Sequence, residues 1–312
     1  MEKYVILADV TCDLSEEIRR YCGMTDYIRG HIHFSDGRDF ATTLDWSKIE
    51  RSELYSALSG KKLDINTAPA SPEEYFRIFK DYADKGYKIL SMSISSKISS
   101  TFNAAQMAAE RLKSECPGCD AYAFDSFRMS GAFGLLVMHA HLLKQEGKTF
   151  EEVIAWLEEN KYKVHQMGPI DDLMYIARRG RISMGKAIMG SFAGVKPMGD
   201  CSNEGYVSVL TKVKGISRSF DITARYVKET ATDISSQPII IAHSNRQEYA
   251  ETLADILLKT VQPKKLFITD VFSGSGANVG PGMIGVYYLG DTVSEDQVKE
   301  KEIMNKILTS SK

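Results

Sequence analysis

The chain has 312 residues, of which 43% are hydrophobic and 26% are charged, and these proportions are typical of soluble globular proteins. This length exceeds what a single hydrophobic core usually organises, so we expect two domains. The 39 basic and 41 acidic side chains nearly balance, which excludes the basic excess that a nucleic-acid-binding protein shows.

Cysteine usage and the first residues indicate the compartment. Met1-Glu2-Lys3 leads directly into a short apolar run without a secretory signal, and the cysteines number five. No apolar run approaches the roughly 20 residues that span a bilayer, so we expect no stable membrane insertion. These features predict a cytoplasmic protein with reduced thiols. Cys116-Pro117-Gly118-Cys119 matches C-x-x-C, but it follows a helical stretch and no second pair lies at zinc-finger spacing, which favours turn cysteines without a function.

The first half of the chain alternates short buried strands with helices. Strands are expected over residues 4–8, 89–94 and 121–124, and helices over 15–21, 71–82, 102–113, 131–145 and 149–159. Ser71-Pro72-Glu73-Glu74 supplies an N-cap serine, a proline at the first helical position and acids in the first turn. This alternation is typical of right-handed βαβ units, so we predict an α/β domain over 1–163 with a mainly parallel sheet and helices on both faces.

The second half has a different pattern. After about residue 163 glycines become denser, and residues 207–213 alternate apolar with polar side chains, as a half-exposed strand does. Buried strands are expected over 238–243 and 265–269, and helices over 217–229 and 247–259. Gly280-Pro281-Gly282 predicts a tight turn before an apolar strand, and His243 is interpreted as a satisfied core histidine. We predict a mixed α/β domain over 164–312, with a ligand between the two domains.

The most informative segment is the strand, turn and helix over residues 89–110. Ser95, Ser96, Ser99, Ser100 and Thr101 crowd the turn. Backbone N–H groups at a helix N-terminus attract anions, and neighbouring hydroxyls add donors. Helix capping alone is the simpler interpretation, but open α/β sheets bind ligands at the carboxyl ends of their strands. We therefore favour a ligand site here.

Other polar positions carry weaker signals. Asp9 and Asp125 follow predicted strands, where capping is favoured over acid–base or magnesium chemistry. The hydroxyl-bearing loop over 66–72 is interpreted as a structural cap. The segment 178–183 places arginines beside a glycine and a possible helix cap at Ser183, which suits a carboxylate or phosphate as well as a solvated surface. Core packing is the default role of Met184, Met189, Phe192 and Met198 near it, although such side chains also suit an acyl chain.

Seven segments in collinear order resemble motifs of the DegV family, which includes the fatty-acid-binding subunits of bacterial fatty acid kinase. The matches cover nearly the whole chain: ADVTCDL at residues 8–14, NTAPASP at 66–72, ISSKISSTFNAA at 94–105, FDS at 124–126, ARRGRIS at 177–183, VKP at 195–197 and NVGPG at 278–282. In the last, Asn278 stands where the family usually has a histidine, so a group that cannot titrate replaces one that can.

The resemblance implies a site between the domains for one long-chain fatty acid. It implies Thr67 and Ser99 as the first carboxylate ligands, Ser96 and Thr101 close by, and an acyl chain housed in the second domain. The matched segments add Arg181, Asn278 and Gly280 to the predicted ligand-binding residues.

The resemblance also implies a function without catalysis. The protein would present the carboxylate to the catalytic subunit of a fatty acid kinase for acyl-phosphate formation, and would need no cofactor, metal or catalytic residue. Two alternatives stay open. One is an enzyme acting on a small phosphorylated metabolite through the Ser95–Thr101 turn, with Asp9 or Asp125 as base. The other is a regulatory partner-binding protein with an empty cleft.

Overall fold

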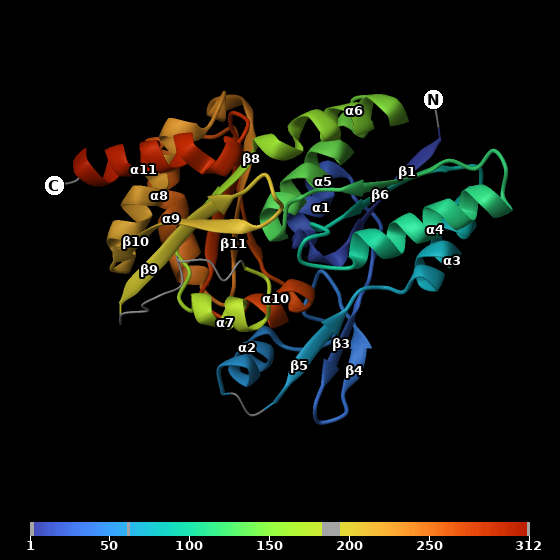
Figure 1. Cartoon of the computed structure of the whole chain (residues 1–312), viewed down its shortest axis with the longest axis horizontal. Coiled ribbons are helices and arrows are strands. Elements are labelled where there is room, and N and C mark those ends of the chain that lie inside the picture. Colours follow the sequence, from blue (N-terminus) through green and yellow to red (C-terminus); the bar gives the residue numbers. More distant parts are fainter. Residues whose placement is uncertain (1–2, 61–62, 183–193, 311–312) are drawn as a thin grey trace.

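Two main sheets lie on either side of helix α5 (Ser130–Gln145) in the computed structural model, which describes residues 3–60, 63–182 and 194–310. In Figure 1 the first sheet with helices α3 and α4 lies on the right, and the second sheet with α8, α9 and α11 lies on the left. The buried residues of α5 belong to one core cluster with residues of both sheets, such as Leu90 and Ile240. Helix α5 therefore joins the two halves of the molecule.

The first sheet is parallel and has the strand order β2-β1-β6-β7. Its strands are β1 (Tyr4–Asp9), β2 (Tyr27–Ile28), β6 (Lys88–Ser93) and β7 (Ala121–Asp125). Along β1, Ile6 and Ala8 pack toward α1 (Glu16–Cys22), α5 and α6 (Phe150–Asn160), whereas Val5 and Leu7 pack toward α3 (Pro72–Ala83) and α4 (Thr101–Glu115). Because successive side chains of a strand point to opposite faces, this burial on both sides requires helices on both faces. The predicted architecture of this half is confirmed.

The predicted cap at Ser71 is present. The Ser71 hydroxyl accepts from the Glu74 backbone N–H at 3.2 Å, and the Glu74 carboxylate accepts from the Ser71 backbone N–H at 2.8 Å. These reciprocal bonds satisfy two donors that a helix start leaves unpaired. They fix the point at which α3 begins, directly after the cavity-lining loop described below.

The second sheet is mixed and has the strand order β12-β11-β13-β8. Its strands are β8 (Val164–Met167), β11 (Pro238–His243), β12 (Lys265–Asp270) and β13 (Ile284–Leu289), and its helices include α8 (Ile216–Thr230), α9 (Gln247–Thr260) and α11 (Val298–Ser310). His243 is fully buried and its Nε2 lies 2.7 Å from Gln247 Oε1, as expected of a core histidine. The mixed α/β prediction is confirmed. The strands of the first sheet precede residue 163 and those of the second follow it, but a domain boundary at 163/164 stays a prediction.

Several shorter elements were not predicted from the sequence. They include the antiparallel strands β3 (His31–Phe34), β4 (Asp39–Ala41) and β5 (Ile65–Ala68), and helices α2 (Arg51–Gly60), α7 (Leu173–Arg178) and α10 (Ser273–Val279). Strand β9 (Val195–Cys201), which pairs with the predicted strand β10 (Val207–Lys214), and the short turns of 3-10 helix η1 (Val10–Cys12), η2 (Lys161–Lys163), η4 (Ile234–Ser236) and η5 (Glu295–Gln297) are further examples. Strands β2 and β8 and the longer helix α11 were not predicted either. Strands β3, β4 and β5 lie with α2 at the bottom of Figure 1.

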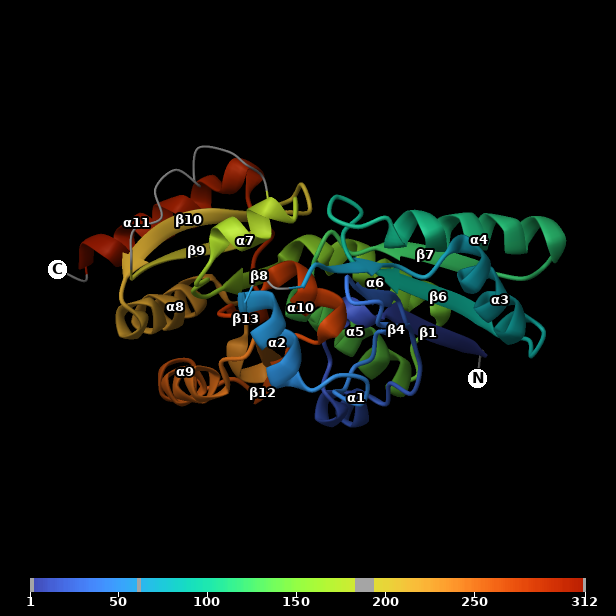
Figure 2. The same cartoon turned by 90° about the horizontal axis from the view of Figure 1, so that it is seen from below.

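Glycine explains why α10 was missed. Its sequence, SGSGANV, has low helix propensity. A Cβ at Gly274 would lie 3.0 Å from Val10 Cγ1, and one at Gly276 would lie 2.8 Å from Tyr55 Oη. The glycines therefore allow α10 to approach η1 and α2 closely, and tertiary packing overrides the local preference. Figure 2 shows α10 next to α2 in the middle of the molecule.

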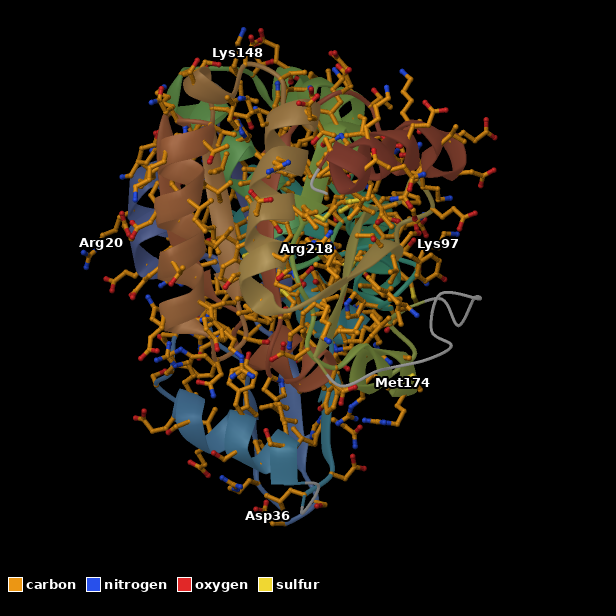
Figure 3. The ribbon with its side chains drawn as sticks, turned by 90° about the vertical axis from the view of Figure 1, so that its left-hand side faces the viewer. Arg20, Asp36, Lys97, Lys148, Met174 and Arg218 are labelled. Atoms are coloured by element: carbon orange, nitrogen blue, oxygen red, sulfur yellow. A yellow bond between two sulfur atoms is a disulfide. The ribbon has the colours of Figure 1, made fainter. Side chains whose placement is uncertain are left out.

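Exposed charged side chains surround this core. Arg20, Asp36 and Lys148 project from the outline of the molecule in Figure 3. Among the residues that the structure describes, no helix is both long enough and apolar enough to cross a membrane.

The expectation of reduced thiols is wrong for one pair of cysteines. Cys116 and Cys119 form a disulfide across the turn between α4 and β7, whereas Cys12, Cys22 and Cys201 are buried and free. The turn Pro117-Gly118, with Gly118 at a φ of 98°, brings the two residues together. Spacing alone did not distinguish a pair held by a turn from two independent thiols.

Candidate functional site

A cavity of about 300 Å³ lies at the carboxyl ends of strands β1, β6 and β7 and extends to the second sheet. The first half of the chain contributes residues such as Thr67, Ser99 and Met129, and the second half contributes residues such as Ile170 and Tyr287. Ligands of open α/β sheets bind at this end of the strands. The two halves of the molecule thus line one cavity together.

Two hydrogen-bonded pairs of predicted site residues, from separate elements, line the cavity. Ser99 lies in the turn after β6 and Thr101 is the first residue of α4, whereas Thr67 belongs to β5 and Asn278 to α10. Ser99 Oγ and Thr101 Oγ1 are 2.7 Å apart, and Asn278 Nδ2 donates to Thr67 Oγ1 at 2.9 Å. We call these four residues the hydroxyl corner.

The hydrogen bonds within the hydroxyl corner leave two hydroxyl hydrogens without an acceptor. Because Thr67 Oγ1 accepts from Asn278, its own hydroxyl hydrogen is available to another acceptor. In the Ser99–Thr101 pair only one of the two hydroxyls donates to the other, so a second hydrogen is available. Within the described residues these hydrogens have no other acceptor. Each of these two hydroxyl hydrogens can donate to an anionic acceptor such as a carboxylate oxygen.

Of the other predicted ligand-binding residues, Arg181 lines the cavity and Ser96 does not. The guanidinium of Arg181 donates to the Arg179 carbonyl oxygen. Partial burial, together with the charge of Arg179, lowers the pKa of Arg181. Ser96 does not line the cavity, and its backbone N–H donates to Asp125 Oδ1 at 3.1 Å.

Gly280 does not line the cavity either, and its role is in the backbone. Its φ of 72° lies in the left-handed region, and a Cβ there would lie 2.8 Å from Tyr175 Cδ1. The turn after α10 therefore requires a glycine. Ser183, Met184, Met189 and Phe192 lie outside the described residues, and Met198 is buried in β9 away from the cavity lining.

The carboxylates of the alternative enzyme hypothesis cap the backbone. Asp9 accepts from the N–H groups of Thr11 and Ile94, both at 2.8 Å, and also from the Thr11 hydroxyl. Burial raises the pKa of Asp9, and these hydrogen bonds lower it only in part. Asp125 Oδ1 accepts two backbone N–H groups at 3.1 Å. The capping interpretation of both residues is confirmed.

The rest of the cavity wall is largely apolar. The apolar side chains among the lining residues are Val10, Ile28, Ala68, Pro69, Ala70, Ile94, Ile98, Met129, Ile170, Ile176, Ile182, Val207, Val279 and Met283. A wall of this kind with a few convergent polar groups is the usual composition of a small-molecule site. The part of the chain that the structure describes has no cluster of three or more His, Cys, Asp or Glu side chains that could hold a metal ion.

Sequence reasoning missed several lining residues, among them Thr42, Tyr75, Gln166 and Ser275. Thr42 follows the unpredicted strand β4, and its Oγ1 accepts from the Gly30 N–H at 3.0 Å. Gln166 lies in β8, whose alternation is too short to indicate which face meets a ligand. Only the tertiary arrangement brings these residues to the cavity, so no local pattern could have identified them.

Comparison with known proteins agrees with this architecture. A family model described as "uncharacterised protein, DegV family" matches residues 3–291. A DegV domain-containing protein of Clostridium perfringens is 30% identical over 292 residues, covering 94% of this chain and 99% of the relative. The chain belongs to the DegV family. The resemblance inferred from the collinear motifs is thereby confirmed.

Solved structures of DegV proteins have the same fold. A fatty-acid-binding DegV family protein from Thermus thermophilus superposes with a TM-score of 0.81 at 22% identity, covering 92% of this chain and 99% of the other. The Fak B3 protein of the fatty acid kinase of Streptococcus pneumoniae, solved with linoleic acid, superposes with a TM-score of 0.77 at 19% identity, covering 93% and 100%. These structures show the fold that this DegV protein shares.

Proposed function

We propose that this DegV protein binds one long-chain fatty acid in the cavity. The carboxylate would accept the free hydroxyl hydrogens of Ser99 or Thr101 and of Thr67, and the acyl chain would extend along the apolar wall toward the second sheet. The observation that supports this proposal best is a single cavity that combines the hydroxyl corner with a largely apolar lining.

The energetics suit such a ligand. Each buried methylene contributes about 0.8 kcal/mol of transfer free energy, before the costs of ordering the chain. A carboxylate removed from water costs several kcal/mol unless it is hydrogen-bonded. Hydrogen bonds to a charged group contribute about 1.5–3 kcal/mol each, so two hydroxyls offset much of that cost. The tail would supply affinity and the hydroxyl corner would set the orientation.

We further propose that the bound acid is presented to the catalytic subunit of a fatty acid kinase in the cytoplasm. A carboxylate oxygen would form a bond to the γ-phosphorus of ATP while the bond from that phosphorus to the ADP oxygen breaks. The kinase would supply the nucleotide site and metal. In support, the Fak B3 protein belongs to such a kinase, and the Asp9 and Asp125 carboxylates of this chain are engaged in capping.

Native mass spectrometry of gently purified protein tests the binding proposal. We expect one long-chain fatty acid per chain, and uptake of added oleate after delipidation. Ser99→Ala should weaken oleate binding by about 1–3 kcal/mol, roughly 5- to 150-fold, because a hydroxyl of the corner is lost. Ser114→Ala is the matched control, since its hydroxyl bonds the Arg111 carbonyl at the other end of α4. Absence of lipid together with no uptake would refute the proposal.

A separate assay tests presentation. Oleate-loaded protein, ATP and the catalytic subunit of a fatty acid kinase should yield an acyl phosphate that hydroxylamine traps as a hydroxamate. Loaded protein without the catalytic subunit should yield none. If the complete mixture gives no hydroxamate while oleate binding is intact, the protein is a fatty-acid-binding protein without this role.

A further inference from the structure

The wall that the second sheet contributes to the cavity contains an amide group. Gln166 of β8 and Tyr287 of β13 are register partners in an antiparallel pair, and both line the cavity. Val164 lies on the same face of β8 as Gln166 and belongs to the core around α5, whereas His165 lies on the opposite face. The strand alternation therefore directs the Gln166 side chain toward the inside of the cavity.

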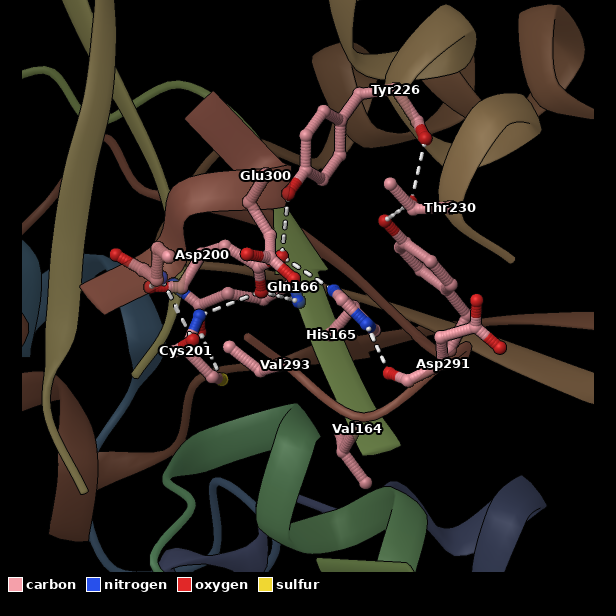
Figure 4. Close-up of polar contacts among 12 residues, drawn as sticks. Val164, His165, Gln166, Asp200, Cys201, Tyr226, Thr230, Asp291, Val293 and Glu300 are labelled. Atoms are coloured by element: carbon pink, nitrogen blue, oxygen red, sulfur yellow. Dashed lines mark hydrogen bonds and ion pairs between the residues drawn. The ribbon is translucent and has the colours of Figure 1, made fainter. Parts of the chain in front are cut away.

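A buried network holds the backbone of Gln166 in place (Figure 4). Asp200 accepts from His165 Nδ1 at 2.6 Å and from Tyr226 Oη at 2.8 Å through Oδ2. It accepts from the backbone N–H groups of Gln166 at 2.7 Å and Cys201 at 2.6 Å through Oδ1. We call these five residues the Asp200 cluster. Its bonds fix the strand position from which the Gln166 side chain extends.

The side chain of Gln166 is held only at its oxygen. Cys201 Sγ lies 3.7 Å from Gln166 Oε1, within reach of a weak thiol hydrogen bond. Within the described residues, Gln166 Nε2 has no hydrogen-bond partner. An amide donor facing a purely hydrocarbon chain would remain unpaired, which disfavours such a ligand.

The neighbouring Tyr287 is fixed by close packing. A Cβ at Gly131 would lie 2.4 Å from its ring, and one at Gly285 would lie 2.5 Å from its Oη, so two glycines make room for it. The ring cannot swing away to admit a different side-chain arrangement beside Gln166 without displacing backbone. The amide is thus presented from a rigid wall.

We infer that Gln166 selects an acyl chain bearing an oxygen substituent, a hydroxyl or keto group, which accepts a hydrogen bond from Gln166 Nε2. This inference rests on the proposed fatty-acid-binding function and names its ligand class more narrowly. The carboxylate occupies the hydroxyl corner of the first half, and the chain oxygen meets the amide on the second sheet. Gln166 is in this sense a specificity-determining residue.

Competition binding tests the inference with octadecanoic acid and a panel of octadecanoic acids that carry one hydroxyl at successive mid-chain positions. For at least one position, the wild type should prefer the hydroxy acid by about tenfold, the size of one hydrogen bond to the unpaired amide donor. Gln166→Leu should abolish this preference and keep or raise the affinity for octadecanoic acid. Gln106→Leu, on the exposed face of α4, is the control and should retain the preference.

The outcomes separate the two proposals. If octadecanoic acid binds and no hydroxy acid is preferred, or if Gln166→Leu retains the preference, the inference about Gln166 is wrong while fatty-acid binding stands. If neither acid binds the delipidated wild type, the proposed function is wrong and the inference falls with it. Thermal unfolding of both variants checks that the fold is retained.

Discussion

The buried Asp200 carboxylate and the partly buried hydroxyl corner are two polar groups with opposite bonding states. In the Asp200 cluster both carboxylate oxygens have two donors each, from His165, Tyr226 and two backbone N–H groups. In the hydroxyl corner, Ser99 pairs with Thr101 and Thr67 with Asn278, and two hydroxyl hydrogens are left over. The Asp200 carboxylate is fully paired without a ligand, whereas the hydroxyl corner keeps two donors for one.

This difference helps to distinguish polar residues that stabilise the fold from polar residues that bind a ligand. A satisfied network contributes by keeping charges paired in a low-dielectric interior, and its loss should appear as lost stability. An incomplete group of donors beside a cavity contributes little to folding, and its loss should appear as lost affinity. The predictions below test whether the two regions divide in this way.

The largest effect is expected at Asp200. Burial by itself would lower the pKa of His165, but the charge and hydrogen bond of Asp200, together with the Asp291 carbonyl and the charge of Glu300, raise it overall. Asp200→Ala leaves the His165 imidazole and the Tyr226 hydroxyl buried without their acceptor, so unfolding free energy should fall by about 3–5 kcal/mol. Urea unfolding measures this, with Ser114→Ala as the control. A loss below about 1 kcal/mol would contradict the structural role assigned to the cluster.

The buried carboxyl of Asp13 should make the free energy of unfolding depend on pH. Burial raises the pKa of the Asp13 carboxyl to about 8, although the hydrogen bonds from the Ser130 hydroxyl and the Phe272 N–H lower it in part. Because the folded pKa lies above the unfolded value of 3.8, the protonated form is favoured on folding, and this contribution is lost as pH rises toward 8.

Asp13→Asn should remove that pH dependence. The loss of stability between pH 5 and pH 8 should be smaller in the variant than in the wild type, by up to about 4 kcal/mol. Urea unfolding at the two pH values measures the difference. Equal pH dependence in both proteins would show that Asp13 does not take up a proton on folding.

Thr67→Val tests the hydroxyl corner with a side chain of similar shape. Oleate affinity should fall by about 1–3 kcal/mol because the carboxylate loses a donor and Asn278 loses its acceptor. Unfolding free energy of the lipid-free protein should change by much less than in Asp200→Ala. If Thr67→Val instead unfolds the protein and leaves the affinity of the remaining folded fraction unchanged, the division between the two regions is wrong.

The smallest effect is expected at Asn278, which contacts the proposed carboxylate site through Thr67. Asn278→Ala should weaken oleate binding by about 0.5–1.5 kcal/mol, the net value of one hydrogen bond. Since neither Asn278 nor Thr67 titrates, the loss should be the same at pH 6 and pH 8. Isothermal titration at both values checks this, and a loss that varies with pH would require a different role for Asn278.

Sequence reasoning predicted the regular part of the fold because there the pattern of buried side chains can be read from residues that are neighbours in the sequence. The alternation along β1 and the cap at Ser71 are local patterns with local causes. Helix α10 was missed because its glycines serve packing against η1 and α2. The pairing of Asn278 with Thr67 joins positions 211 residues apart, and only the resemblance to a family brought both into one predicted site.

The residues that sequence reasoning could not place are those that depend on a neighbouring strand. Gln166 faces the cavity because β8 pairs with β13, and nothing in the run Val-His-Gln-Met indicates which face would be covered. Ser96 shows the reverse case, in which a residue inside a matched motif lies off the cavity lining and its backbone N–H bonds Asp125. Neighbours in a motif need not share a surface.

A crystal structure of the delipidated protein after soaking with oleate is the most direct test of how the two halves divide the ligand. We predict carboxylate oxygens within hydrogen-bond distance of the Thr67 hydroxyl and of Ser99 or Thr101, with the hydrocarbon chain passing Met129 and Ile170 toward Tyr287. A reversed acid with its carboxylate at Gln166, or a cavity without lipid at saturating oleate, would contradict it.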